Sequence, residues 1–313
     1  MAANIFDGST DSNWGTAANW SLNAVPTATD ANVATFDATS PACTVNASNR
    51  VCNGIDFTGY TNTVTMTFNI TVSGSVTLAA GMGVAGTGTL AVNATSTLTS
   101  NGKVWPNAFT LNGNGTYTLA DNWNVDGLLS AGFGTQVING FQITASAGFT
   151  VIGTSSYTVS GTTNIILDGT GTVTYGTGSP TLRNNLTINT AGTITFATTN
   201  PIRYDIGTFT YTAGTVVTTG STLNVGVGNG TTTTLAVAGI TWNNVGFFGA
   251  STTTLNENLT LTGLLTLTSS TNAITINGNT INASGGVRHG GTSAIVSGTT
   301  VINVNGTGTL DAP

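Results

Sequence analysis

Charged side chains are scarce in this sequence, and their scarcity excludes several kinds of protein. They make up 5% of the 313 residues, against about 25% in a typical soluble domain. The five basic residues are too few to form the clusters of Lys and Arg that bind phosphate backbones, so we expect no nucleic-acid partner. The single Lys and the single Glu leave few of the residues that favour exposed helical surface.

Cysteines and long apolar runs are equally rare. Cys43 and Cys52 are the only cysteines, too few for a disulfide framework. Two buried free thiols are favoured, with a Cys43–Cys52 bridge as the alternative. No apolar run reaches the roughly 18 residues that a membrane-spanning helix needs, and the N-terminal residues lack a basic stretch followed by an apolar one. We therefore expect neither membrane insertion nor a standard secretory signal.

Small polar and β-branched residues take the place of the missing charges. Thr is the most frequent residue, Gly follows with 42, and Asn is abundant. Hydrophobic residues reach 39% and the mean hydropathy is +0.21, unlike a disordered chain, in which low hydrophobicity accompanies high charge. Because Thr, Val and Ile favour strands, we predict an all-β fold.

A long degenerate repeat runs along most of the chain. Each copy opens with Asn, alternates apolar with polar residues and closes on Thr-x-Thr before an apolar residue; the openings are Asn53, Asn107, Asn184 and Asn243. Such alternation indicates short strands with one buried face. Asn-Gly pairs, which suit corners with positive φ, begin at Asn53, Asn101, Asn112, Asn114, Asn139, Asn229, Asn277 and Asn305.

This pattern predicts a parallel β-solenoid, or β-helix, over residues 51–313, with about 20 residues in each coil. Coils stacked about 4.8 Å apart would align Asn and Thr side chains in ladders along the axis. The alternative is an array of β-sandwiches, in which the Asn-Gly pairs would form hairpin turns. Residues 1–50, which contain Trp14 and Trp20, are predicted to form an N-terminal β cap or attachment segment that covers an open end of the solenoid.

The segment from Trp14 to Phe36 resembles part of two known groups of proteins. Its Trp14-Gly-Thr-Ala-Ala-Asn-Trp-Ser stretch, followed by Pro26, Asp30 and Phe36, is similar to the opening before the repeats of phage β-helical fibre, spike and decoration proteins and of autotransporter-type passenger domains. The later stretch that begins at Asn258 resembles their repeats. The resemblance implies a β-helical protein that forms a homo-oligomer, with a trimer favoured, and it transfers no catalytic residue.

Together with the missing export signal and membrane barrel, this resemblance predicts a structural virion protein. It would be a phage tail fibre, spike or capsid-decorating protein, located in the virion, that acts in assembly or host-surface adhesion. Its partners would be identical chains, other virion proteins or a host surface glycan. A bacterial adhesin that binds glycans at the cell surface or outside the cell is the first alternative. A tailspike polysaccharide depolymerase is the second, and an ice-binding protein, suggested by the Thr-x-Thr elements, is the last.

No residue is assigned to catalysis, a metal or a cofactor, the binding surface is left open, and we expect no enzymatic activity. Glycoside hydrolysis needs two carboxyl groups about 5–9.5 Å apart, and the residues considered are Asp121 with Asp126, Asp168, Asp205 and Glu257. His289 beside Arg288 lacks the pattern of a catalytic triad and is expected in a surface turn. Calcium could find oxygen ligands at Asp7, Asp11, Asp30 and Asp37.

Five aromatic residues complete the set of candidates: Trp105, Trp123, Tyr204, Tyr211 and Trp242. Exposed on the surface, such rings could stack on sugars or anchor a subunit interface. Trp105 and Trp242 come just before an Asn that opens a repeat copy, and for these two we expect a place in the core.

Overall fold

The protein is an all-β solenoid of parallel strands, as a computed structural model describes it over residues 3–132, 134–153, 158–228, 230–268, 273–290, 296–306 and 309–311. The strand pairs whose register is defined are all parallel, and the helical content of these ranges is the 3₁₀ helix η1 (Ala17–Asn19). A β-sandwich requires antiparallel neighbours, so the sandwich alternative was wrong. The chain divides into two compact units, Met1–Ala147 and Gly148–Pro313.

Three stacks of parallel strands build the first unit. The first stack contains β1 (Ala3–Ile5), β2 (Val33–Thr35), β5 (Ile55–Asp56), β8 (Val76–Thr77), β11 (Ser96–Thr99), β14 (Gly115–Leu119) and β17 (Gln136–Gly140). The second contains β4 (Arg50–Cys52), β7 (Ile70–Val72), β10 (Leu90–Val92), β13 (Phe109–Asn112) and β16 (Leu129–Gly132). The third has two runs, β3 (Cys43–Val45), β6 (Thr63–Met66) and β9 (Gly83–Gly86), then β12 (Val104–Trp105), β15 (Trp123–Val125) and β18 (Ile143–Ala145).

The second unit repeats this three-strand coil after a start with longer strands. Its first strands are β19 (Gly148–Ile152), β20 (Thr158–Leu167), β21 (Gly171–Tyr175), β22 (Thr181–Phe196) and β24 (Gly207–Val217). The stack on β24 continues through β26 (Thr232–Ala236), β29 (Thr252–Leu255), β32 (Ile274–Gly278) and β35 (Val296–Ser297). A second stack contains β23 (Ile202–Tyr204), β25 (Thr222–Val225), β28 (Asn244–Phe248), β31 (Leu265–Thr268), β34 (Gly286–Gly290) and β37 (Thr309–Asp311). The third contains β27 (Thr241–Trp242), β30 (Leu259–Leu261), β33 (Ile281–Ala283) and β36 (Ile302–Val304).

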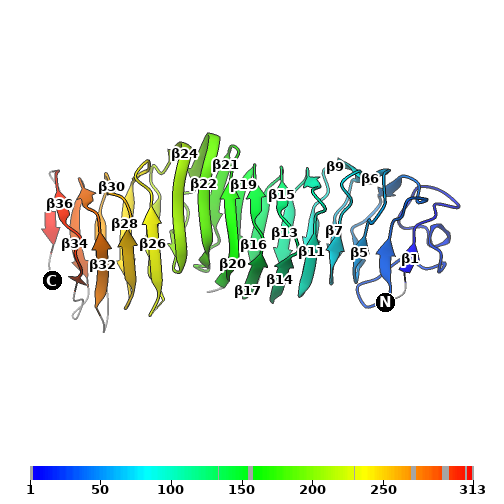
Figure 1. The fold of residues 1–313 in the computed structure, drawn as a ribbon, viewed down its shortest axis with the longest axis horizontal. Helices are drawn as coiled ribbons and strands as arrows, with labels where there is room; N and C mark the ends of the chain where they lie inside the picture. The colour runs from blue at the N-terminus through cyan, green and yellow to red at the C-terminus, as the bar shows by residue number, and fades with distance from the viewer. Residues whose placement is uncertain are drawn as a thin grey trace. The chain divides into compact units, whose positions relative to one another are not determined.

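Alternation within each strand creates the core of both units. In β25, Leu223 and Val225 point inward and are buried, whereas Thr222 and Asn224 face outward. The inward residues of successive coils lie in register, so that Ile70 pairs with Leu90, which in turn pairs with Phe109. Each fully buried side chain of this size stabilises the fold by about 1.5–3 kcal/mol. Figure 1 shows the successive coils of each unit in sequence order.

Some of the Asn-Gly pairs form corners with positive φ between strands, as expected, and others do not. Asn101 and Gly102 have φ angles of 50° and 76°, so both residues of this tight turn adopt the left-handed region, which Gly and Asn tolerate best. The glycines of four further pairs, Gly113, Gly140, Gly230 and Gly278, also have positive φ. Those of the pairs at Asn53, Asn114 and Asn305 do not, and Asn229 lies outside the described residues.

The long sequence repeat does not follow the stacking of coils. Ile55, just after Asn53, pairs with Val76 in the first stack of its unit, whereas Phe109, just after Asn107, pairs with Leu90 in the second stack. In the second unit, Asn184 lies inside β22, while β28 after Asn243 pairs with β25. Every face of a coil needs the same apolar–polar alternation, so similar sequences recur on different faces. The structural unit is the coil of about 20 residues, as the spacing of Asn69 and Thr89 shows.

The first fifty residues share the register of the coils that follow. β1 pairs with β2, and β2 pairs with β5, all in parallel. Trp14 and Trp20 pack edge to face with ring centroids 5.0 Å apart, and Phe36 contacts both rings. A role of this segment as a cap or attachment module stays a prediction.

Buried Asn19 ties the N-terminal loop to this aromatic cluster. Its Nδ2 donates to Asp11 Oδ1 at 2.6 Å and to the carbonyl of Asn13 at 2.8 Å, and its Oδ1 accepts from the backbone N–H groups of Thr10 and Asp11. The Asn before Trp20 is therefore a structural residue of the Trp-containing motif.

We predict that Asn19→Ala lowers the free energy of unfolding by about 2–3 kcal/mol, because it removes the four hydrogen bonds of a fully buried side chain. Urea unfolding followed by Trp fluorescence measures the change. The matched control is Asn124→Ala, at an outward position of β15, with an expected change within about 0.5 kcal/mol. Equal losses in both variants would contradict the structural role of Asn19.

Candidate functional site

Two of the carboxylates weighed for catalysis hold corners of the neighbouring coil. Both oxygens of Asp121 accept backbone hydrogen bonds at 2.7 Å, one from Ser100 and one from Asn101. Glu257 Oε2 accepts from the N–H of Ala238 at 2.9 Å. Asp121 and Glu257 therefore do the same structural work in their separate units.

Asp205 is fully buried in an ion pair. Its Oδ2 lies 2.6 Å from Nη2 of Arg183, and its Oδ1 accepts from the N–H of Gly228 and the hydroxyl of Thr231. The pair forms because Leu182 is in register with Tyr204, which places the two following residues on adjacent coils. A carboxylate that is fully buried and held by three donors is not accessible to a polysaccharide substrate.

The remaining candidate acids are not stacked on one another. Asp168 follows Leu167, whose partner is Ile188, so the neighbouring coil presents Asn189 at that level. Asp126 follows Val125, and its own N–H donates to the carbonyl of Trp105. In the register of the described strands, no candidate carboxylate lies opposite another.

The four N-terminal acids accept hydrogen bonds from residues close to them in the N-terminal segment. The backbone N–H of Asn13 donates to Asp11 and lowers the pKa of that carboxyl, and the hydroxyl and N–H of Thr39 do the same for Asp37. Asp7 accepts from the N–H of Ser9, and Asp30 from that of Thr27. Among the residues with described placement, no group of three or more His, Cys, Asp or Glu side chains could hold a metal.

The cysteines and the histidine also have defined places. Cys43 and Cys52 are buried free thiols, which confirms the favoured prediction. Burial raises the pKa of both thiols, that of Cys52 to about 12. His289 lies in strand β34, where it pairs with Leu267, so its expected place in a turn was wrong; flanking glycines did not interrupt the ladder.

Most of the five aromatic candidates lie in the core. Trp105 and Trp242 are buried as expected, but so are Trp123 and Tyr204, which excludes them from stacking on sugars at the surface. Aromatic neighbours explain the burial of these two residues. The ring centroids of Trp123 and Phe109 are 4.9 Å apart, and those of Tyr204 and Phe209 are 5.7 Å apart. Tyr211 is partly exposed, and its hydroxyl donates to the carbonyl of Gly214.

Outward-facing Thr side chains form short ladders in the second unit. Thr232 and Thr234 of β26 stack on Thr252 and Thr254 of β29. In β32 the row continues with Thr275, while Asn277 takes the other position. The regular Thr-x-Thr array thus covers two adjacent coils and then changes composition.

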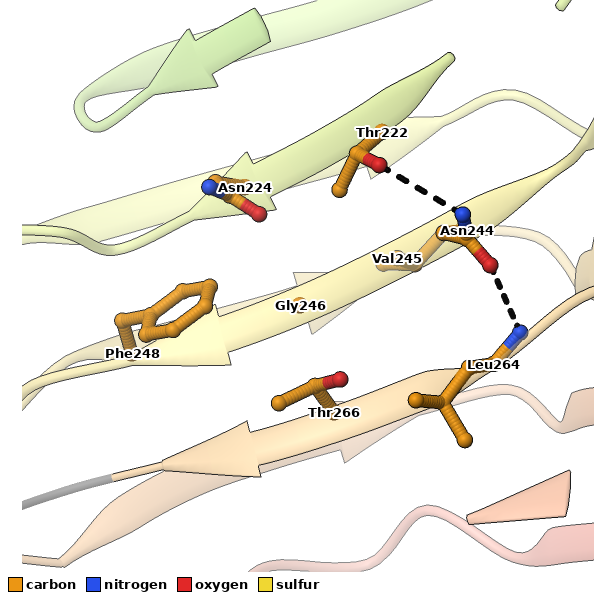
Figure 2. A pocket seen from close by; sticks show the side chains of 8 residues that line it. All are labelled: Thr222, Asn224, Asn244, Val245, Gly246, Phe248, Leu264 and Thr266. Atoms are coloured by element: carbon orange, nitrogen blue, oxygen red, sulfur yellow. Dashed lines mark hydrogen bonds between the residues drawn. The ribbon is translucent and has the colours of Figure 1, made fainter. Parts of the chain in front are cut away.

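A groove of about 210 Å³ interrupts the outer surface over β25, β28 and β31 (Figure 2). Its floor is formed by Gly246, which lies in register between Asn224 and Thr266. At one side Asn244 is fixed, because its Oδ1 accepts from the N–H of Leu264 at 2.8 Å and its Nδ2 donates to Thr222 at 3.5 Å. Phe248 forms the other side.

The absent side chain at Gly246 makes room for the ring of Phe248, which packs over the glycine and bounds the groove. A Cβ atom there would lie 2.3 Å from Cε2 of Phe248 and 3.0 Å from Oδ1 of Asn224. The φ angle of Gly246 is not in the left-handed region, so the glycine provides space and not an unusual backbone. Within the described ranges, neither the Asn224 amide nor the Thr266 hydroxyl has a hydrogen-bond partner.

Sequence reasoning did not single out Gly246 or Phe248. The available signal was the repeat copy that begins at Asn243, in which Gly and Phe stand at positions that carry Thr, Asn or Asp in the other copies. That signal can be interpreted only when the register is known, because alternation alone does not say which residues are neighbours on adjacent coils.

Comparisons of this chain with protein-family models, curated proteins and solved structures found no match. Within the ranges that the structure describes, no helix is long and apolar enough to cross a membrane. Interpretation of the groove therefore depends on its own geometry.

We predict that stability falls as the pH rises from about 9 to about 12. The pKa of Cys52 is raised from 9.0 to about 12, and that of Tyr117 from 10.0 to about 12, both by burial. Below pH 9 both groups are protonated in either state; at higher pH they ionise first in the unfolded chain, which favours unfolding. Urea titrations at each pH measure the fall.

Cys52→Ala is the informative variant for this pH dependence. It removes one ionising group, so the free energy of unfolding should fall less steeply between pH 9 and 12, by up to about 1.4 kcal/mol per pH unit. This change in slope is expected whatever stability the variant loses at pH 7. An unchanged slope would contradict the assignment.

Proposed function

We propose that this chain is a structural virion protein, a phage tail fibre, spike or capsid-decorating protein that acts in assembly or host-surface adhesion and not in catalysis. The proposal that the chain is not catalytic is carried by one observation: the candidate carboxylates are already engaged within the fold. Asp121 and Glu257 accept backbone hydrogen bonds at corners, and Asp205 is paired with an arginine. A depolymerase would need two suitably spaced carboxyl groups that can exchange protons. The virion assignment rests on the resemblance of the Trp14–Phe36 segment.

The outer surface of the coils suits such a role. Its rows of Thr and Asn offer hydroxyl and amide groups that both donate and accept hydrogen bonds without charge, as in the row of Thr208, Thr234 and Thr254. Such a surface fits a hydroxyl-rich glycan or the same face of an identical chain. Closed symmetry is the usual outcome of association between identical chains, and the resemblance favours a trimer.

A bacterial surface adhesin that binds glycans is the second candidate. The groove over Gly246, with a partly exposed Phe248 beside uncharged polar groups, favours this function as much as it favours a viral adhesin. The two candidates share one surface chemistry and differ in where the protein is displayed.

We predict that the purified chain is a homo-oligomer, binds bacterial cells and leaves their polysaccharides intact. Light scattering after size exclusion gives the mass, co-sedimentation of labelled protein with Gram-negative and Gram-positive cells gives binding, and a reducing-end assay on the extracted polysaccharides gives cleavage. A monomer that binds no cells would contradict the proposal. Release of reducing ends that Asp126→Asn or Asp168→Asn abolishes would replace it with a depolymerase.

A further inference from the structure

The groove over β25, β28 and β31 has the features of a small preformed binding site (Figure 2). Two polar side chains at its edges, Asn224 and Thr266, have unused hydrogen-bonding capacity within the described ranges. An aromatic ring, Phe248, stands beside them on the same outward side.

We propose that this groove binds one neutral saccharide ring of a surface glycan. The sugar ring lies in the groove with its apolar face against Phe248, and its hydroxyls hydrogen-bond to the Asn224 amide and the Thr266 hydroxyl. This inference rests on the proposed adhesive function and names the ligand class and the site through which adhesion occurs.

The composition of the lining selects a neutral, hydroxylated ligand. An amide offers two donors and an acceptor and a hydroxyl offers both, which matches sugar hydroxyls, and the lining contains no charged side chain. Ligand sites combine aromatic surface with a few convergent polar groups in this way. The volume of about 210 Å³ is below the roughly 300–1,000 Å³ of sites for drug-sized molecules, so the groove suits one ring of a longer chain.

The backbone of the groove and its Asn244 side are held by hydrogen bonds before any ligand arrives. Asn244 is fixed between Thr222 and Leu264 by its two side-chain hydrogen bonds. The floor strand β28 pairs on both sides, with β25 and with β31. A rigid site loses little conformational entropy on binding, which matters for a contact as small as a single sugar ring.

Two arginines lie near the groove, and their positive charge would favour an acidic sugar. Arg203 is in register with Asn224, and Arg288 with Thr266, so they lie beyond the groove along the same outward row. Arg203 Nη1 already donates to the carbonyl of Ser179 at 3.1 Å, and neither arginine lines the groove. The neutral ring is therefore the assigned ligand, and an acidic sugar is one outcome of the test.

Saturation-transfer NMR on the full chain tests this site, because it detects weak binding directly. The probes are the methyl glycosides of glucose, galactose, mannose and N-acetylglucosamine, with methyl glucuronide as the acidic comparison. At least one neutral glycoside should bind, and Phe248→Ala or Asn224→Ala should weaken its binding roughly tenfold or more. Gly246→Ala, which places a methyl group against Phe248, should abolish it.

Matched controls separate the groove from the general surface. Phe141→Ala removes an aromatic ring that is 56% exposed elsewhere, and Asn256→Ala removes an exposed amide; both should bind the glycoside as the unaltered chain does. Circular dichroism and thermal unfolding establish that each variant is folded, and Asn224→Ala keeps the test decisive if a change at Gly246 disturbs the strand.

Three outcomes would overturn the inference. They are the absence of binding by every neutral glycoside, binding that survives both Phe248→Ala and Asn224→Ala, and a preference for glucuronide that Arg203→Ala removes. If Phe248→Ala dissociates the oligomer, the groove is an interface between copies. Groove variants that still bind cells would leave the adhesive function standing and reject this site, whereas an unaltered chain that binds neither cells nor glycosides would reject both.

Discussion

Parallel backbone hydrogen bonding between successive coils is the constraint on which the rest of this structure depends. It places each outward residue directly over a residue of the next coil, about 4.8 Å away. Like charges in such rows would repel, whereas amides and hydroxyls can bond to their own kind. The Asn303 Nδ2 donates to Asn282 Oδ1 at 3.2 Å, and the hydroxyl oxygens of Thr275 and Ser297 are hydrogen-bonded at 3.0 Å. The low charge and the abundance of Asn and Thr follow from this geometry.

The few carboxylates occur where the ladders leave backbone groups without partners. Parallel strands satisfy one another, but corners expose N–H groups that need a local acceptor. Asp121 and Glu257 accept from such groups of a neighbouring coil. Asp205 also accepts from a corner N–H, that of Gly228, and its remaining charge is balanced by Arg183. These three acidic residues therefore have structural roles, which neutral side chains such as Asn69 and Asn114 fill at other corners.

Sequence reasoning predicted the strands, the parallel solenoid, the coil length and the free thiols, because each depends on local alternation or composition. It could not predict the register, since the copies at Asn53 and Asn107 have similar sequences and lie in different stacks. The burial of Trp123 and Tyr204 and the strand position of His289 depend on that register. So does the groove, whose members Asn224, Gly246 and Thr266 are neighbours only across coils.

A solenoid surface of matched rows is nearly flat, and a concave site requires a break in those rows. Replacing one outward Thr or Asn by glycine removes a single member of a row and leaves space that a neighbouring side chain, here the ring of Phe248, partly fills. Gly246 is such a break, because Asn224 and Thr266 remain above and below it and Phe248 stands beside it. The floor stays rigid, since a glycine with ordinary strand geometry keeps its ladder hydrogen bonds. In this fold, a concave ligand site is therefore expected where the row of outward side chains is interrupted while the backbone hydrogen bonds between coils continue.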